Sequence, residues 1–154
     1  KPYLTINIET KKGYDSLDKI LPYCKGFIDN ITIGRSDFSA SYFKKEIIPD
    51  SKFISDKIVK ISEKAKKFGI TTTVGGSVSK KTIASYKKKP VLIKNLKNLE
   101  TRKVIMPIKK FIYNKKAIDH AIKFESLYIL LKNEINEFKL LNEKNRLTTL
   151  NTRK

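Results

Sequence analysis

The chain of 154 residues is 40% hydrophobic and 32% charged, which is typical of one globular domain and excludes a largely disordered chain. Its formal charge of +19 comes from lysines spread along the whole length with few arginines, which does not favour a nucleic-acid site, because base recognition prefers the forked guanidinium. No apolar run approaches the ~20 residues of a membrane helix and the charged amino terminus does not look like a signal peptide, so we expect a cytoplasmic protein without a membrane partner.

The first half of the chain predicts two short strands, each followed by a helix. Residues 3–9 and 31–37 are rich in β-branched and apolar side chains, as strands are. Apolar residues at helical spacing predict a short helix over 13–23 and a longer amphipathic helix over 54–68 that stops at a glycine. The polar residues 38–50 are expected to form a loop.

The second half repeats the alternation. We predict a strand over 70–74, a helix capped by Ser79 that continues through residue 86, a strand over 102–106 and one long helix, or a broken pair, over 115–145. Such an order is typical of an α/β fold with parallel strands in a single domain, residues 1–154. Four β/α units equal half of an eightfold (β/α) barrel of the TIM type, which needs ~250 residues, although they could also form a small open parallel sheet.

Two carboxylates end the first two predicted strands, Glu9 and Asp37. The carboxyl ends of parallel strands open on the same face, so these two side chains could meet there and hold one divalent cation. The alternative is that they are two separate, solvated acids at the ends of strands.

Several short motifs in this order and spacing resemble one known family. They are Ile6-Asn-Ile-Glu-Thr10, Leu17-Asp-Lys-Ile20, Ile31-Thr-Ile-Gly-Arg-Ser-Asp37, Gly75-Gly-Ser77 and Leu99-Glu-Thr-Arg-Lys-Val104, followed by a helix around Ala121-Ile-Lys-Phe-Glu125. Together they resemble the HpcH/HpaI aldolase and citrate lyase β-subunit family.

The resemblance implies a fold, a metal site and a substrate site. The family fold is a barrel of the phosphoenolpyruvate/pyruvate type, of which this chain would be the carboxy-terminal four β/α units. Glu9 and Asp37 would bind Mg²⁺ or Mn²⁺, and the backbone amides of Ser36 and Asp37 would hold the substrate carboxylate. Asn7 stands where family members often have Gln, near substrate or metal-bound water. The catalytic Arg and His of the family lie on earlier strands, which these residues do not include.

The implied function is that of a divalent-metal-dependent carbon–carbon lyase, an aldolase or citrate lyase, acting on a 2-oxo acid or an acyl-thioester (acyl-CoA-type) substrate. A hard cation would stabilise the enolate that forms when the carbon–carbon bond breaks. Two alternatives remain open: a catalytically inactive half-barrel remnant or binding module, and a basic nucleic-acid-binding domain. A half barrel with open edges and an apolar inner face would need the missing amino-terminal half or a second copy as its partner.

Other side chains near the predicted strand ends have more than one possible role. Arg35 could pair with a neighbouring acid or hold a loop, and Gly75-Gly76 could form a tight turn or approach an anion. Glu100 and Arg102 could line the mouth of the site or form an ion pair. Lys103 would be the Schiff-base residue if the protein were a metal-free aldolase.

Overall fold

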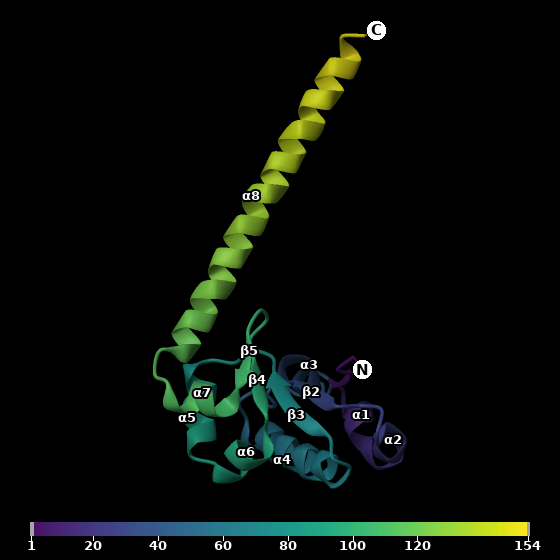
Figure 1. Cartoon of the computed structure of the whole chain (residues 1–154), viewed down its shortest axis with the longest axis vertical. Coiled ribbons are helices and arrows are strands. Elements are labelled where there is room, and N and C mark those ends of the chain that lie inside the picture. The colour runs from purple at the N-terminus through teal and green to yellow at the C-terminus, as the bar shows by residue number, and fades with distance from the viewer. Residues whose placement is uncertain (1, 154) are drawn as a thin grey trace.

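The computed structural model describes residues 2–153 and shows an α/β fold built on one five-stranded sheet (Figure 1). In their order across the sheet, the strands are β1 (Thr5–Ile8), β2 (Asn30–Gly34), β3 (Thr71–Gly75), β4 (Asn98–Glu100) and β5 (Ile105–Pro107). Neighbouring strands from β1 to β4 pair in parallel, whereas β5 runs antiparallel to β4. The predicted α/β class is therefore confirmed.

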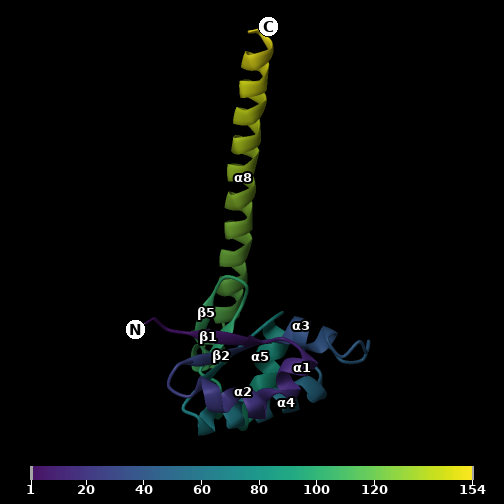
Figure 2. The ribbon, with the colours of Figure 1, turned by 90° about the vertical axis from the view of Figure 1, so that its right-hand side faces the viewer.

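The helices before the carboxy-terminal one are α1 (Lys11–Asp15), α2 (Leu17–Cys24), α3 (Arg35–Ala40), α4 (Lys52–Lys67), α5 (Lys80–Lys87), α6 (Pro90–Asn95) and α7 (Ile108–Tyr113). Figure 2 shows two of them, α2 and α4, beneath β1 and β2. The core lies between these helices and one face of the sheet, where Ile31, Ile33 and Val74 are fully buried against residues such as Ile58 and Ile61 of α4.

Side chains alternate along the strands between this apolar core and a polar face. In β2, Ile31 and Ile33 point into the core, and their neighbours Asn30 and Thr32 line a hollow on the opposite face. The period of two is that of a strand with one apolar and one polar side. The expectation that the sheet face opposite the helices is apolar is therefore wrong, because threonine and asparagine occupy the strand positions on that face.

The helices with the clearest sequence signals are confirmed with small shifts of their bounds. Helix α4 begins after Ser51, whose side chain accepts a hydrogen bond from the amide of Ile54, and it ends before Gly69, which has a φ of +73°. Helix α5 begins after Ser79, which forms a reciprocal capping box with Thr82. These caps supply hydrogen-bond partners for amides that the first turn of a helix leaves free.

The last predicted strand is wrong in its position and direction. Residues 98–107 form a hairpin of β4 and β5 in place of one parallel strand over 102–106. The turn is held by Thr101, whose amide donates to the Val104 carbonyl oxygen and whose hydroxyl accepts from the Val104 amide. A hydroxyl that bonds to nearby backbone favours such a turn.

Two further segments differ from the prediction. Residues 35–40 form α3 in place of the end of the strand predicted over 31–37 and the start of the loop predicted over 38–50, and the Ser39 hydroxyl donates a hydrogen bond to the Ser36 carbonyl oxygen. The helix predicted over 13–23 is divided at Ser16 into α1 and α2. The long helix predicted over 115–145 is confirmed as one unbroken helix, α8 (Ala117–Asn151), of 35 residues.

The sheet does not close into a barrel within residues 2–153, where β1 and β5 form its two edges. In the same part of the chain, no helix has a stretch long and apolar enough to cross a membrane, and this includes α8.

Candidate functional site

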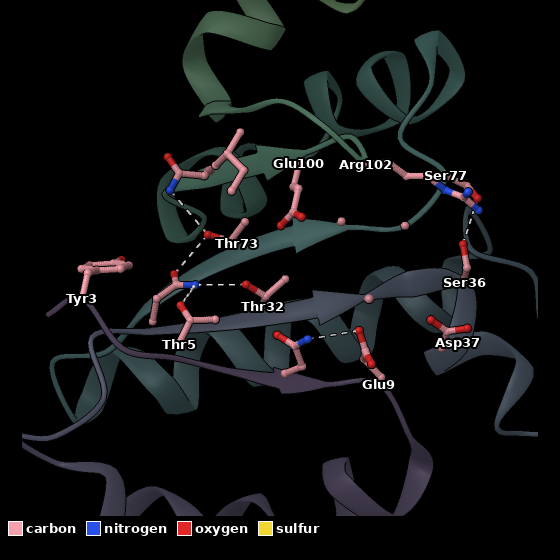
Figure 3. Close-up of a pocket in the computed structure, with 17 residues that line it drawn as sticks. Tyr3, Thr5, Glu9, Thr32, Ser36, Asp37, Thr73, Ser77, Glu100 and Arg102 are labelled. Atoms are coloured by element: carbon pink, nitrogen blue, oxygen red, sulfur yellow. Dashed lines mark hydrogen bonds between the residues drawn. The ribbon is translucent and has the colours of Figure 1, made fainter. Parts of the chain in front are cut away.

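The polar face of the sheet forms a hollow of about 590 Å³ (Figure 3). Its floor consists of threonine, asparagine and glycine residues from β1 to β4, and acidic side chains stand at the carboxyl ends of the strands. Small-molecule sites commonly have volumes of roughly 300–1,000 Å³. The hollow therefore has the size of a ligand site, with an acidic rim.

The amide of Asn30 holds the floor together at the amino ends of the strands. Its Nδ2 donates to Oγ1 of Thr5 and of Thr32 at 3.0 and 3.2 Å, and its Oδ1 accepts from Oγ1 of Thr71 and of Thr73 at 3.0 and 3.1 Å. Asn30 is 3% exposed, so its polar atoms depend on these partners. The network fixes the relative positions of β1, β2 and β3.

At the other end of the strands, two glutamates flank a pair of glycines. Gly34 of β2 and Gly75 of β3 are partners in the sheet register. A Cβ at Gly34 would lie 2.6 Å from Oε1 of Glu9, and a Cβ at Gly75 would lie 3.6 Å from the Cβ of Glu100. Because Gly34 and Gly75 lack side chains, the Glu9 side chain has room beside the end of β2, and Glu100 can lie against the end of β3.

The second predicted metal ligand stands at the same end of the sheet. Asp37 is exposed in the first turn of α3, and it lines the hollow together with Glu9. Figure 3 shows both carboxylates at the carboxyl ends of the strands. Within residues 2–153, no hydrogen bond or ion pair engages the Asp37 side chain, and Glu9 has one long hydrogen bond, 3.5 Å, from Asn7 Nδ2. Both carboxylates therefore keep oxygen atoms available to a ligand.

Arg35 fixes the loops that surround these acids. It is fully buried, and its Nη1 forms an ion pair with Oδ1 of Asp50 at 2.7 Å. Its Nε and Nη2 donate to the carbonyl oxygens of Gly75 and Gly76 at 3.2 and 2.6 Å. The guanidinium also lies 5.9 Å from the ring centroid of Tyr86, whose hydroxyl pKa burial raises to about 12. Arg35 thus holds a loop, one of the two roles considered from the sequence.

Gly76 and Ser77 complete this arrangement at the end of β3. Gly76 has a φ of +77°, and a Cβ there would lie 2.7 Å from the backbone nitrogens of both Arg35 and Ser36. Only glycine fits such a close approach of two backbones. The hydroxyl oxygens of Ser36 and Ser77 lie 2.9 Å apart, which links the end of β2 to the end of β3.

The carboxyl of Glu100 differs electrostatically from an ordinary exposed glutamate. Burial, and then the charge of Glu9, raise the pKa of Glu100 above its usual value. A negative carboxylate is therefore disfavoured at this position, and a cation or a proton near the rim would relieve the repulsion.

All four residues predicted from the sequence to bind metal or substrate, namely Asn7, Glu9, Ser36 and Asp37, line this one hollow. Residues 2–153 contain no group of three or more His, Cys, Asp or Glu side chains arranged to hold a metal ion. A cation at this rim would therefore take two protein carboxylates and complete its coordination with ligand or water oxygens, as Mg²⁺ commonly does.

Two residues that hold the site together lie outside the elements predicted from the sequence. Asp50 falls in the loop expected over 38–50, although it neutralises the buried Arg35, and Asn30 precedes the strand predicted over 31–37, although it organises the floor. The signal for Asn30 is the polar side chains at alternate strand positions, Thr5 and Asn7 in β1, Asn30 and Thr32 in β2, and Thr71 and Thr73 in β3, which are typical of a polar sheet face.

Comparison with protein-family models and with curated proteins finds no match to this chain.

Proposed function

We propose that this chain carries the metal- and carboxylate-binding part of a divalent-metal-dependent carbon–carbon lyase of the aldolase or citrate lyase type. The substrate would be a 2-oxo acid or an acyl thioester. The observation that carries the proposal is that Glu9 and Asp37 share one rim of one polar hollow. Both acids that the resemblance implies as metal ligands reach this rim, where Glu100 of another motif is a third acid.

The donor set fits Mg²⁺ or Mn²⁺. Glu9 and Asp37 offer hard, anionic oxygen atoms and no sulfur or imidazole stands beside them in the hollow, which suits these cations better than zinc or copper. When bound, such a cation would stabilise the negative charge that develops on the substrate when its carbon–carbon bond breaks.

The residues of the chain have separable roles in this proposal. Glu9 and Asp37 hold the cation, and Gly34 leaves the space into which the Glu9 carboxylate extends. Ser36, linked to Ser77, offers its hydroxyl and the nearby backbone amides to the substrate carboxylate. Arg102 also lines the hollow and supplies a positive charge for the same anionic group.

The open side of the hollow favours one alternative, a binding module without turnover. The hollow is bounded by a single sheet, and its lining residues include no histidine. In the lyase proposal, further strands from the amino-terminal half of a barrel or from a second copy would cover this face and its β1 edge.

A cluster of lysines favours the other alternative, binding of a polyanion such as nucleic acid. Lys60, Lys64, Lys66 and Lys67 of α4 and Lys94 of α6 surround a shallow hollow of about 670 Å³. The cluster contains Glu63, and Lys64 forms an ion pair with Asp18 at 2.7 Å, which reduces its positive charge. Without arginine or aromatic residues at this surface, we rank this function below the lyase.

Titration of Mn²⁺ into the full chain tests the lyase site. We expect Glu9→Gln and Asp37→Asn each to weaken Mn²⁺ binding by about 10-fold or more, because each removes one of two anionic ligands. The matched control is Glu46→Gln, which removes an equal charge from an exposed position outside the hollow and should leave the affinity unchanged. Equal affinities in all four proteins would contradict the shared site.

A further inference from the structure

Helix α8 leaves the body of the protein and extends away from it (Figures 1 and 2). Its 35 residues correspond to a length of about 50 Å at 1.5 Å per residue. Only Ala117, Ile118 and Ala121, all in its first two turns, are buried. From Ile122 to Asn151 every residue of the helix is exposed except Glu125, which is half-buried.

The uncovered part presents a continuous apolar stripe. Alternating steps of four and three residues connect Ala117, Ala121, Phe124, Tyr128, Leu131, Ile135 and Phe138. The first two contact the body, whereas the five larger side chains are between 42% and 65% exposed. Such spacing is typical of the contact face of a coiled coil. The face that packs on the body at the start of α8 therefore continues along the exposed helix.

The stripe begins in an apolar groove. Val104 and Met106 of the hairpin, together with Ala117, Ala121 and Phe124 of α8, line a hollow of about 370 Å³. Next to it, Lys103 Nζ lies 4.3 Å from the ring centroid of Tyr128 and holds the hairpin against the helix. The groove lies beside Ala121, where a small side chain leaves space for a large one from another helix.

The charges distinguish α8 from the rest of the chain. Its five acidic residues, Asp119, Glu125, Glu134, Glu137 and Glu143, equal in number its five basic ones, Lys123, Lys132, Lys139, Lys144 and Arg146, so the helix is neutral and the net +19 lies outside it. Two bodies with such a charge repel each other at short range. A neutral helix can pair with a second copy of itself if the pairing keeps the bodies apart.

We propose that α8 is a self-association surface that pairs antiparallel with α8 of a second copy of this chain. In the antiparallel arrangement that sets Phe124 against the second copy's Ile135, Tyr128 meets Leu131, and Phe138 reaches Ala121 and the groove beside it. Glu125 then lies opposite the second copy's Lys132, and the symmetry repeats this opposite-charge pair.

The size of the surface agrees with a stable pair. Apolar side chains also flank the stripe at Leu127 and Leu141, which are 55% and 54% exposed. Half-exposed side chains of this size on two helices would bury on the order of 1,500 Å², which is within the range of specific protein interfaces. The antiparallel direction places the two basic bodies near opposite ends of the pair, several screening lengths apart at physiological salt.

Sedimentation velocity of the full chain at tens of micromolar tests the pairing. We expect the wild-type chain to sediment as a dimer or a multiple of it and Leu131→Glu to weaken association by about 100-fold or more, because a charge would enter a desolvated layer. The matched control is Leu130→Glu: Leu130 is 57% exposed, Leu131 is 56% exposed, and Leu130 lies off the stripe. Circular dichroism verifies that both variants stay folded. A monomeric wild type, or equal effects of the two variants, would overturn the proposal.

Disulfide trapping tests the direction. In a Cys24→Ala background, chains with Phe124→Cys are mixed with chains with Ile135→Cys and oxidised mildly. The antiparallel pair predicts that the mixed disulfide predominates, since the two positions then face each other. If only symmetric disulfides form, each position faces its own copy and the antiparallel arrangement is wrong.

Discussion

The carboxylate of Glu9 occupies the space that a side chain at Gly34 would fill: a Cβ at position 34 would lie 2.6 Å from Oε1 and 2.9 Å from Cγ of Glu9. The metal ligand proposed directly after β1 therefore depends on the absence of a side chain at position 34, the last residue of β2.

We expect Gly34→Ala to weaken Mn²⁺ binding by about 10-fold, because the new methyl group displaces the flexible Glu9 side chain from the rim. The free energy of unfolding should change little, since a half-buried side chain can move towards solvent. Mn²⁺ titration and urea unfolding measure the two effects. The matched control is Gly75→Ala, the register partner, where a Cβ meets Glu100 only at ordinary contact distance. Equal Mn²⁺ affinities of Gly34→Ala and wild type would contradict this relationship.

The second prediction concerns the buried ion pair of Arg35 and Asp50. Asp50→Ala should destabilise the fold by about 3–5 kcal/mol, because it leaves the fully buried guanidinium without its counter-ion. Urea unfolding gives the change. The control is Asp56→Ala, which breaks the exposed ion pair with Lys52 and should leave stability nearly unchanged. If Asp50→Ala and Asp56→Ala lower the free energy of unfolding equally, Asp50 is not needed to neutralise the buried Arg35.

The sequence was sufficient for features that depend on local pattern. The spacing of Ile54, Ile58, Ile61 and Ala65 predicted α4, and Ser79 predicted the start of α5, because helical period and capping act within a few residues. The positions of Glu9 and Asp37 at one rim could also be predicted, since the topology of parallel strands brings their carboxyl ends together.

Features that depend on distant contacts could not be predicted. Arg35 and Asp50 are joined across 15 positions, and nothing local to Asp50 marks it as a buried partner. The hairpin of β4 and β5 depends on one side chain, Thr101, which closes the turn. The polar face of the sheet is indicated by polar residues at alternate strand positions, such as Asn30 and Thr32, but the apolar interior that is usual in a barrel favours the opposite expectation.

The third prediction concerns Asn30. Asn30→Ala should destabilise the fold by about 2 kcal/mol, because the hydroxyls of Thr5, Thr71 and Thr73 lose the amide that connects them on a largely buried surface. Asn98→Ala is the control, because Asn98 makes one long hydrogen bond of 3.4 Å to Thr73. Urea unfolding should give Asn30→Ala a clearly lower free energy of unfolding than Asn98→Ala. The reverse order would show that the Asn30 network contributes little to stability.

The fourth prediction follows from the raised pKa of Glu100. The folded state holds the Glu100 proton more tightly than the unfolded chain does. Its contribution to stability is therefore fully present below the unfolded pKa and is lost as the pH rises through the higher folded pKa. Glu100→Gln should remove this loss and be more stable than wild type at pH 7. Thermal unfolding from pH 3 to 8 measures it, with the exposed Glu46→Gln as control. A constant difference between the melting temperatures of wild type and Glu100→Gln from pH 3 to 8 would contradict the prediction.

The last prediction separates binding from turnover. The hollow contains two carboxylates for a cation, two serines and Arg102 for an anionic group, but no histidine that could transfer a proton. The Arg and His that the family resemblance implies on earlier strands would stabilise charge and transfer a proton, and the lack of each such group lowers a rate by about 10²–10⁴-fold. The full chain should therefore bind Mn²⁺ and pyruvate yet release almost no pyruvate from oxaloacetate or an aldol substrate. Turnover is measured with a coupled pyruvate assay in the presence of Mn²⁺, with Glu9→Gln as the control for background decarboxylation by free metal. Rapid turnover that Glu9→Gln abolishes would mean that residues assigned to support, such as Glu100, transfer the proton themselves.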